Sequence, residues 1–190
     1  TSAAVKAITA VAFVGFASQA MAADVTWDRL LNAQNDDANW MMYHKDFTGH
    51  HHSGLKQINT RNVKNLKLAW QHNPAATKRG IQGFPLAVDG MVYYTTTSGT
   101  IWALNGATGQ PVWHHAAKID VERAEGTFYN PYNRGLAIGH GNVYMGTTDG
   151  RLIALNAKSG EVVWDNEIMS VAKGNKGFTG APVIVKDMVI

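Results

Sequence analysis

The chain has 190 residues, of which 45% are hydrophobic and 16% are charged, a composition typical of a globular protein and not of a disordered one. Its formal net charge is only +3, and its Lys and Arg residues form no cluster, which argues against nucleic acid as a partner. The absence of cysteine excludes disulfides and thiolate metal sites within this stretch.

The first 22 residues have the pattern of a secretory signal peptide. Lys6 precedes an apolar run over residues 7–17, and an Ala-Met-Ala cleavage pattern follows at residues 20–22. The run is short for a membrane span, although an uncleaved anchor is the alternative interpretation. We therefore expect residues 1–22 to be a cleaved signal peptide and Ala23 to begin the mature chain. For a bacterial source, this predicts export to the periplasm.

The region that follows is predicted to lead into a β-sheet. Residues 27–33 favour a short helix or an extended lead-in, and the apolar residues 40–43 favour a first strand. Leu66, Leu68 and Trp70 alternate with other residues, which predicts a strand within residues 62–71. A polar, Gly-containing connection then follows.

Residues 90–113 and 141–164 are two copies of one pattern, aligned without a gap at an offset of 51 residues. Each copy, with the residues just before it, contains four short runs of strand-forming residues separated by Gly-containing turns. The eight runs are residues 85–88, 91–96, 100–104, 111–114, 135–138, 142–146, 151–155 and 162–164. Four antiparallel strands joined by tight turns form one propeller blade, and a repeat of this period indicates a propeller or solenoid. A third copy begins over residues 181–190.

Two residue types recur at the same place in each copy. Gly109 and Gly160 stand in turns that are predicted to need positive φ. Trp113 and Trp164 end the fourth strand, where an indole can wedge between neighbouring sheets against a glycine. The sequence therefore predicts an all-β fold, a β-propeller. Because propellers close with about 4–8 blades, we expect residues 23–190 to be the N-terminal part of a larger propeller domain, with three to four blades in part.

The repeat resembles the tryptophan-docking motif of quinoprotein dehydrogenases, the eight-bladed propellers that carry pyrroloquinoline quinone. Its pattern here is Gly-x-Ile/Leu-x-Ala-Leu-Asn-x-x-Thr/Ser-Gly-x-x-Val-Trp. Other segments are similar to the methanol and ethanol dehydrogenase branch of that family. They are Trp40-x-x-Tyr-x-x-Asp46, Leu55-x-Gln-Ile-Asn59, residues 62–70, Asn133-Arg-Gly135, residues 147–155 and Thr179-Gly-Ala-Pro182.

The resemblance implies an enzyme, a pyrroloquinoline quinone-dependent alcohol dehydrogenase of the periplasm. Such an oxidoreductase oxidises an alcohol to an aldehyde or ketone and passes electrons to a cytochrome. A Ca²⁺ or lanthanide ion beside the cofactor acts as a Lewis acid, and an aspartate takes the alcohol proton. The implied partners are a small alcohol, a periplasmic cytochrome and, as an option, a second copy in a homodimer.

The resemblance also implies which residues contact the cofactor. Arg134 matches an arginine that binds a cofactor carboxylate, and Thr179 matches a threonine with the same role; a structural role is the alternative for each. Gln82 stands where the family usually has Glu. Phe128 and Tyr129 stand where the family has adjacent cysteines over one face of the quinone, so an aromatic ring could stack there instead. We expect the catalytic aspartate and the metal ligands to lie beyond Ile190, with none in this stretch.

Two other functions remain open from the sequence. One is a non-catalytic propeller that serves as a scaffold or assembly protein, and the other is a degenerate quinoprotein that has lost its cofactor. The run His50-His-His52 resembles a metal cluster, but a solvated loop is the simpler interpretation because three consecutive residues of a strand cannot all face one site.

Overall fold

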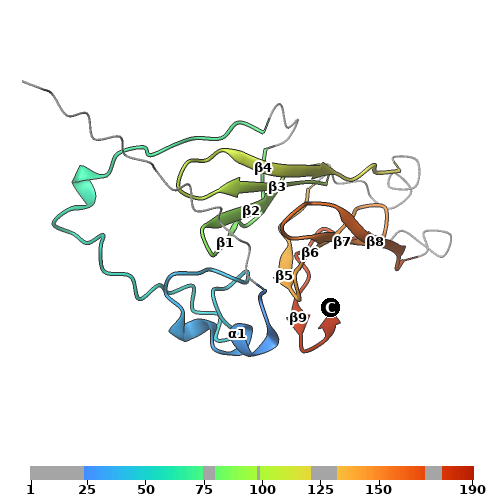
Figure 1. Ribbon diagram of the computed structural model, residues 1–190, viewed down its shortest axis with the longest axis horizontal. Helices are drawn as coiled ribbons and strands as arrows, with labels where there is room; N and C mark the ends of the chain where they lie inside the picture. Colours follow the sequence, from blue (N-terminus) through green and yellow to red (C-terminus); the bar gives the residue numbers. More distant parts are fainter. Residues whose placement is uncertain (1–23, 75–79, 98, 121–131, 170–176) are drawn as a thin grey trace, which may run out of the picture.

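Antiparallel β-sheet dominates the computed structural model (Figure 1). The structure describes residues 24–74, 80–97, 99–120, 132–169 and 177–190. Helix is confined to short pieces near the start of the described chain. They are the α-helix α1 (Trp27–Leu31) and the 3₁₀ turns η1 (Ala33–Asn35) and η2 (Val63–Asn65).

The described strands form two four-stranded sheets and one two-stranded sheet, and in each four-stranded sheet the strand order follows the chain. The first sheet contains β1 (Leu86–Val88), β2 (Met91–Thr95), β3 (Thr100–Asn105) and β4 (Pro111–Ala116). The second contains β5 (Ala137–Gly139), β6 (Asn142–Gly146), β7 (Arg151–Asn156) and β8 (Val162–Glu167). The third contains β9 (Ile184–Val185) and β10 (Met188–Val189). This confirms the predicted propeller blades and the start of a third.

The hairpins that open the two blades share one type of turn, and each contains a glycine, as predicted. Asp89 and Gly90 have φ of 49° and 80° between β1 and β2, and His140 and Gly141 have φ of 52° and 74° between β5 and β6. Two successive residues with positive φ form the turn whose twist matches that of the flanking strands. Aspartate tolerates this conformation better than most residues, and glycine adopts it without strain.

The two blades also share one irregularity. The pairing of β3 with β4 shifts register between Ala103 and Leu104, and the pairing of β7 with β8 shifts between Ala154 and Leu155. Both alanines are fully buried. The repeat therefore specifies a bulged edge as well as the strand pattern, and the outermost strand of each blade bends in the same way.

An indole from each segment docks on a glycine of the next blade. A Cβ added to Gly109 would lie 2.5 Å from Trp70, and one added to Gly160 would lie 2.6 Å from Trp113. The two glycines have φ of 71° and 73°, as predicted. Trp70 Nε1 donates to Gly106 O over 2.9 Å. Only glycine allows an indole to lie this close, so one contact joins the first blade to the segment before it and the other joins the second blade to the first.

A single carbonyl of the second blade receives two donors from the first. Trp113 Nε1 and Tyr93 Oη each donate to Ala157 O over 3.1 Å. Tyr93 is fully buried, and its burial raises the pKa of the phenol above the ordinary value. Its ring lies 6.0 Å from that of Trp113, and Tyr144 and Trp164 repeat this pairing at 5.9 Å in the second blade.

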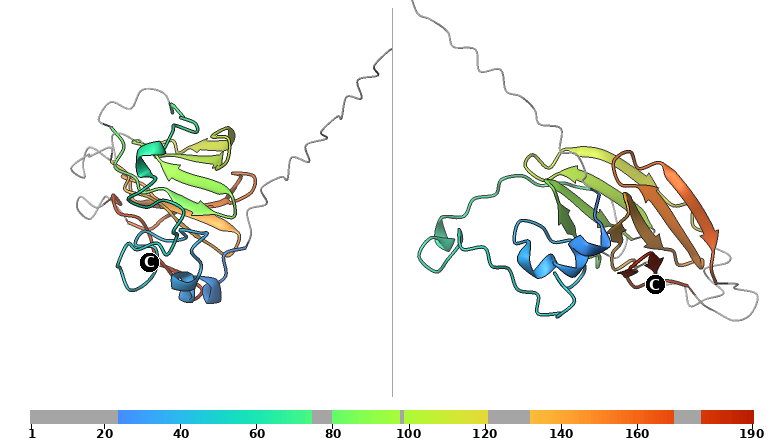
Figure 2. Two further views of the ribbon diagram at one scale, coloured as in Figure 1. Left: turned by 90° about the vertical axis from the view of Figure 1, so that its left-hand side faces the viewer. Right: turned by 60° about the horizontal axis from the view of Figure 1, so that its bottom comes forward.

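The inner strands β5 and β6 of the second blade are more deeply buried than β1 and β2 of the first, whereas its outermost strand β8 is largely exposed. The second blade has neighbours on both sides (Figure 2). In β6 the last four residues are all buried, whereas alternate residues of β2 remain half-exposed. On one side Met145 Cε lies 3.6 Å from the position of a Cβ at Gly99. On the other, Ile184 Cγ1 lies 3.2 Å from that of a Cβ at Gly139. Neighbouring sheets thus bury each other's faces.

A buried aspartate organises the end of the second blade. Asp149 accepts hydrogen bonds from Thr147 Oγ1, from the backbone N–H of Asp120 at 2.9 Å and from Arg151 Nε at 3.1 Å. Burial raises the pKa of Asp149, but these hydrogen bonds and the charge of Arg151 outweigh burial and hold the pKa below its usual value. Arg151 also bridges to Asp165 at 2.5 Å.

The N-terminal segment packs against the edge formed by β1 and β5. Helix α1 forms within the predicted range, with the Thr26 hydroxyl accepting from Arg29 N at 3.2 Å. Arg29 reaches both carboxylate oxygens of Asp89 at 2.7 and 2.8 Å. Lys45 is buried and donates to Ala33 O and Asp36 O at 2.8 and 2.7 Å. The Arg29–Asp89 pair attaches α1 to the first blade, and the Lys45 hydrogen bonds hold the loop that follows α1 against the residues just after the helix.

Two predicted strands of this region are wrong. Residues 40–43 make only one bridge, in which Trp40 and Ala87 exchange both backbone hydrogen bonds. Residues 62–71 contain η2 and otherwise irregular chain, with Leu66 59% and Leu68 77% exposed. A strand requires a neighbouring strand to pair with, and the described residues provide none for 62–71.

No helix in the described part of the chain is long and apolar enough to cross a membrane.

Candidate functional site

Three segments that lead into β1, β5 and β9 lie side by side, and each carries one predicted cofactor contact. Phe84 N donates to Arg134 O over 3.2 Å, and Arg134 N donates to Thr179 O over 3.0 Å. Gln82 lies two residues before Phe84. The backbone therefore brings Gln82, Arg134 and Thr179 onto neighbouring segments, although 97 residues separate the first from the last (82 to 179). We call these three segments, residues 82–84, 133–135 and 178–181, the inner ledge.

The residues on either side of Arg134 fix the backbone at this position of the inner ledge. The side chain of Asn133 is buried; it donates to Gly146 O at 2.9 Å and accepts from Gly135 N at 3.0 Å. Gly135 has φ of 139°, which a residue with a side chain rarely adopts. Together they form a turn that fixes the backbone of Arg134 while its side chain stays exposed. Asn133 is named in the sequence analysis only as part of a motif, and the signal for its role is an Asn that is followed two residues later by Gly.

Gln82 precedes a glycine that the first blade requires. A Cβ on Gly83 would lie 2.6 Å from Thr95 Oγ1 and 2.8 Å from Thr95 O, so only glycine lets this segment lie against β2. The Thr95 hydroxyl is buried and has no hydrogen-bond partner among the described residues. Gln82 itself is exposed. The close packing of Gly83 thus places the Gln82 amide at the surface of the inner ledge.

Thr179 is fixed through its neighbour in the chain. Phe178 N donates to Thr147 O over 2.9 Å, and Phe178 Cβ lies 2.5 Å from the position of a Cβ at Gly146. The backbone of the segment is therefore pinned to β6 immediately before Thr179. The Thr179 side chain is half-buried.

The inner ledge presents an amide, a guanidinium and a hydroxyl, all hydrogen-bond donors. Arg134 forms no ion pair or side-chain hydrogen bond with a described residue, so its planar fork is available to an anion. This donor set fits a ligand that carries several carboxylates and carbonyl oxygens, such as pyrroloquinoline quinone. Two other predicted contacts, Phe128 and Tyr129, lie outside the described residues, as does the predicted signal peptide.

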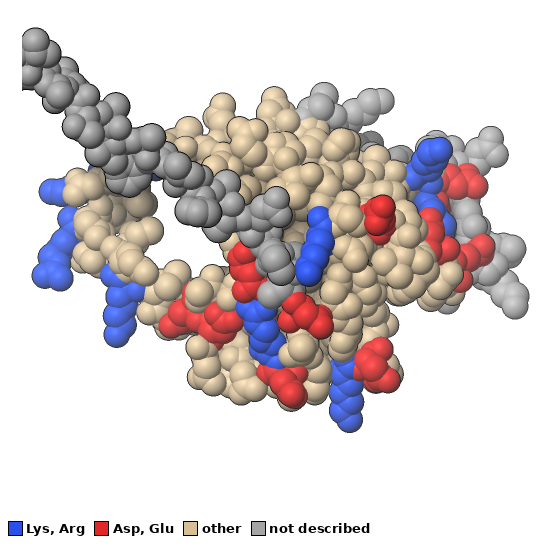
Figure 3. Space-filling view, viewed as in Figure 1, with Lys and Arg blue, Asp and Glu red and all other residues tan. Residues whose placement is uncertain are grey.

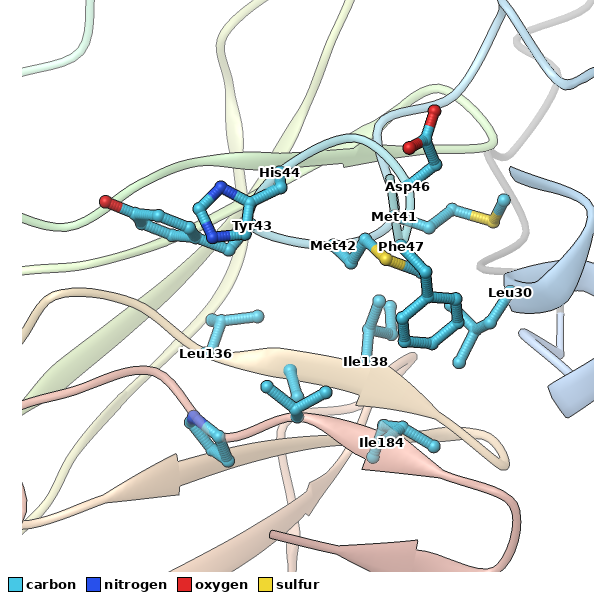
Figure 4. Close-up of a pocket in the computed structure, with 13 residues that line it drawn as sticks. Leu30, Met41, Met42, Tyr43, His44, Asp46, Phe47, Leu136, Ile138 and Ile184 are labelled. Carbon is cyan, nitrogen blue, oxygen red and sulfur yellow. The ribbon is translucent and has the colours of Figure 1, made fainter. Parts of the chain in front are cut away.

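A cavity of about 230 Å³ lies between the loop after α1 and the strands β5 and β9 (Figure 4). Its walls are mainly apolar side chains, among them Met42, Phe47, Ile138 and Ile184. His44 stands at one end beside Tyr43. Such walls offer few groups that could orient a polar reactant, so the cavity is a gap in the packing and the inner ledge is the better candidate site.

The three consecutive histidines are exposed, as expected for a solvated loop. His50 and His52 line a polar hollow with Asp37 and Asp46. Both carboxylates are already engaged: Asp46 accepts from Thr48, whose hydrogen bonds lower the pKa of Asp46, and Asp37 accepts from the backbone of Gly54. In the part of the chain that the structure describes, no group of three or more His, Asp or Glu side chains is arranged to hold a metal ion.

The surface shows no broad field of one sign among the described residues in the view of Figure 3. Acidic and basic side chains are mixed around α1 and at the end of the second blade, and the upper part of this face is uncharged. The basic side chains without acidic neighbours stand on the extended segment at the left, which contains η2.

Comparison with known proteins gives consistent matches. The family model of the PQQ-type glucose/ethanol/alcohol dehydrogenase β-propeller domain matches residues 40–190. The dehydrogenase subunit of alcohol dehydrogenase (quinone) from Gluconacetobacter polyoxogenes is 40% identical over 191 residues, which span 96% of this chain and 26% of the relative. The lanthanide-dependent methanol dehydrogenase of Methylacidiphilum fumariolicum is 34% identical over 86% of this chain and 27% of the relative.

A solved structure shows the same arrangement of strands. The quinohemoprotein alcohol dehydrogenase ADHIIG of Pseudomonas putida superposes with a TM-score of 0.82 at 34% identity, over 87% of this chain and 24% of that one. The chain thus spans about a quarter of the length of the relatives that it matches.

Proposed function

The chain belongs to the family of glucose, ethanol and alcohol dehydrogenases built on a PQQ-type β-propeller, and on that premise we propose that it is part of a quinoprotein that oxidises an alcohol. The observation that carries this proposal is the convergence of Gln82, Arg134 and Thr179 on the inner ledge. A non-catalytic propeller has no need for three exposed or half-exposed donors on adjacent inner segments.

In this proposal the residues of the inner ledge bind and orient the cofactor. The Arg134 guanidinium holds a carboxylate through two parallel hydrogen bonds. The Thr179 hydroxyl donates to a second carboxylate oxygen, and the Gln82 amide donates to a carbonyl oxygen without adding charge. When bound, pyrroloquinoline quinone supplies the two-electron oxidant and its Ca²⁺ or lanthanide ion the Lewis acid. The substrate is a small alcohol that is oxidised to an aldehyde or ketone.

The remaining parts of the proposal rest on the relatives and on the start of the sequence. A relative named as lanthanide-dependent supports a lanthanide as an alternative to Ca²⁺. A structural neighbour named as a quinohemoprotein supports a cytochrome as the electron acceptor. The signal-like residues 1–22 support the periplasm as the location. We propose that the proton acceptor and the metal ligands are supplied by other parts of the full-length protein.

The test is cofactor binding to the full-length protein prepared without cofactor. Quinone affinity is measured from tryptophan quenching, with Ca²⁺ or La³⁺ present, for the wild type, Arg134→Ala, Arg134→Lys and the control Arg61→Ala, an exposed arginine away from the ledge. Loss of charged hydrogen bonds predicts a loss of about 10- to 100-fold for Arg134→Ala. Arg134→Lys keeps the charge but not the fork, so its loss should be smaller.

Two results would contradict the proposal. If the wild type binds no quinone with either metal, the chain is part of a scaffold or of a quinoprotein that has lost its cofactor. If it binds quinone but Arg134→Ala binds equally well, the inner ledge is not the site. Dye-linked oxidation of short primary and secondary alcohols by the loaded protein then identifies the substrate class.

A further inference from the structure

Two histidines of the loop after α1 face each other at close range. His44 Nδ1 and His51 Nε2 are 2.6 Å apart, and the ring planes are nearly perpendicular, at 89°. Both side chains are exposed. His51, the middle one of three consecutive histidines, is thus paired with His44, which lies seven residues earlier in the chain.

The loop holds this pair in place from several directions. The Tyr43 ring contacts both imidazoles, with centroids 4.5 Å from His44 and 6.1 Å from His51. Phe84 lies behind them, 4.8 Å from Tyr43 and 6.1 Å from His51. Lys45, next to His44, is anchored by its two hydrogen bonds to backbone carbonyls. The two nitrogens are therefore brought together by fixed neighbours and not by the chance meeting of two free side chains.

The chemistry of the pair suits a metal ion. A hydrogen bond between two imidazoles requires that one of the facing nitrogens carries a lone pair and the other a proton. A divalent ion can replace that proton and take a lone pair from each ring, because neutral imidazole is a good ligand for Zn²⁺, Cu²⁺ and Ni²⁺. At metal–nitrogen distances of about 2.0–2.1 Å, the nitrogens need a separation of about 3 Å. Exposed side chains can open by the few tenths of an ångström required.

We propose that His44 and His51 chelate one divalent transition-metal ion, Cu²⁺ most tightly, with water in the remaining coordination positions. This site uses two nitrogen ligands, so Ca²⁺ and lanthanide ions, which prefer several oxygen ligands, should not compete for it. The proposal is independent of the proposed alcohol oxidation and of the ion beside the quinone. It also differs from a cluster of His50, His51 and His52, since His50 and His52 line the separate polar hollow.

The test is Cu²⁺ binding to full-length protein from which metal has been removed. Calorimetric titration with Cu²⁺ alone should show one equivalent in the wild type that His44→Ala and His51→Ala each weaken at least tenfold. His52→Ala is the matched control, as an exposed neighbour that does not join the pair, and should bind within about twofold of the wild type. Electron paramagnetic resonance should show two imidazole nitrogens in the wild type and one fewer in either variant.

The dependence on pH and on other ions gives two independent measurements. Binding should weaken in acid, because protons compete with the metal ion for the two facing nitrogens. Excess Ca²⁺ or La³⁺ should leave the Cu²⁺ titration unchanged. The proposal is overturned if His44→Ala and His51→Ala bind Cu²⁺ as the wild type does, or if His52→Ala removes the site instead.

Discussion

Substitution of Gly160 by alanine tests the contact that joins the two complete blades. The added Cβ would lie 2.6 Å from Cδ2 and Cε3 of Trp113, well inside ordinary contact, so the indole must move. The left-handed backbone of Gly160 adds a cost of about 1–2 kcal/mol for any L-residue. Overpacking at the indole adds about 1–3 kcal/mol. We therefore expect Gly160→Ala to lower the free energy of unfolding by about 2–5 kcal/mol.

The chain offers a matched control in Gly141→Ala. Gly141 has φ of 74°, almost the same as Gly160 at 73°, but no atom lies within 4 Å of its added Cβ. Gly141→Ala should therefore cost only the backbone strain of about 1–2 kcal/mol. The difference between the two variants isolates the contact with the indole.

The assay is urea-induced unfolding of the full-length protein, followed by far-ultraviolet circular dichroism at pH 7. The same pair of substitutions is then repeated with Trp113→Ala, where Gly160→Ala should cost no more than Gly141→Ala because the indole is gone. Equal losses for the two glycine variants in the wild-type background, within about 0.5 kcal/mol, would refute the close contact between Gly160 and Trp113.

Other contacts lead to further expectations in the same unfolding assay. Trp113→Phe keeps an aromatic ring but removes the N–H that donates to Ala157 O, and should cost about 0.5–1.5 kcal/mol; no loss would mean that the hydrogen bond does not contribute. Lys45→Met deprives two backbone carbonyls of a charged donor and should lower the free energy of unfolding by about 1.5–3 kcal/mol. The control Lys64→Met, at an exposed lysine, should lower it by less than about 0.5 kcal/mol. Equal effects of the two substitutions would contradict the buried role of Lys45. Because the folded pKa of Asp149 is lowered, its charge stabilises the fold above the unfolded pKa of about 3.9 and this contribution is lost as pH falls through the folded value. The stability gap between wild type and Asp149→Asn should therefore be constant above about pH 5 and shrink below about pH 4; a gap that grows in acid would contradict the lowered pKa.

The blades could be predicted because their signals are local. The Gly-containing turns and the short strand-forming runs lie within a few residues of each other, and the second copy repeats them. The strand predicted over residues 62–71 is wrong because a strand also needs a pairing partner, which no local signal specifies. Alternation shows that a segment can be a strand, but the partner that would pair with it is set by the rest of the fold.

The candidate site was predicted in part. Gln82, Arg134 and Thr179 came from a resemblance between short motifs, and the structure adds that they lie on adjacent segments. The link from Phe84 to Arg134 joins residues 50 positions apart, and no local pattern encodes such a pairing. The pairing of His44 with His51 was also invisible, because it depends on a loop backbone in which His51 takes a positive φ of 53°.

The indole contacts run in one direction along the chain, and this bears on how the protein folds during synthesis. Trp70 donates to a carbonyl 36 residues downstream, and Trp113 to one 44 residues downstream. Each emerging blade therefore meets an indole that has already left the ribosome, and each closure spans less than one repeat of 51 residues. Short closures cost little loop entropy and form quickly. A large propeller built this way can grow blade by blade in the direction of synthesis.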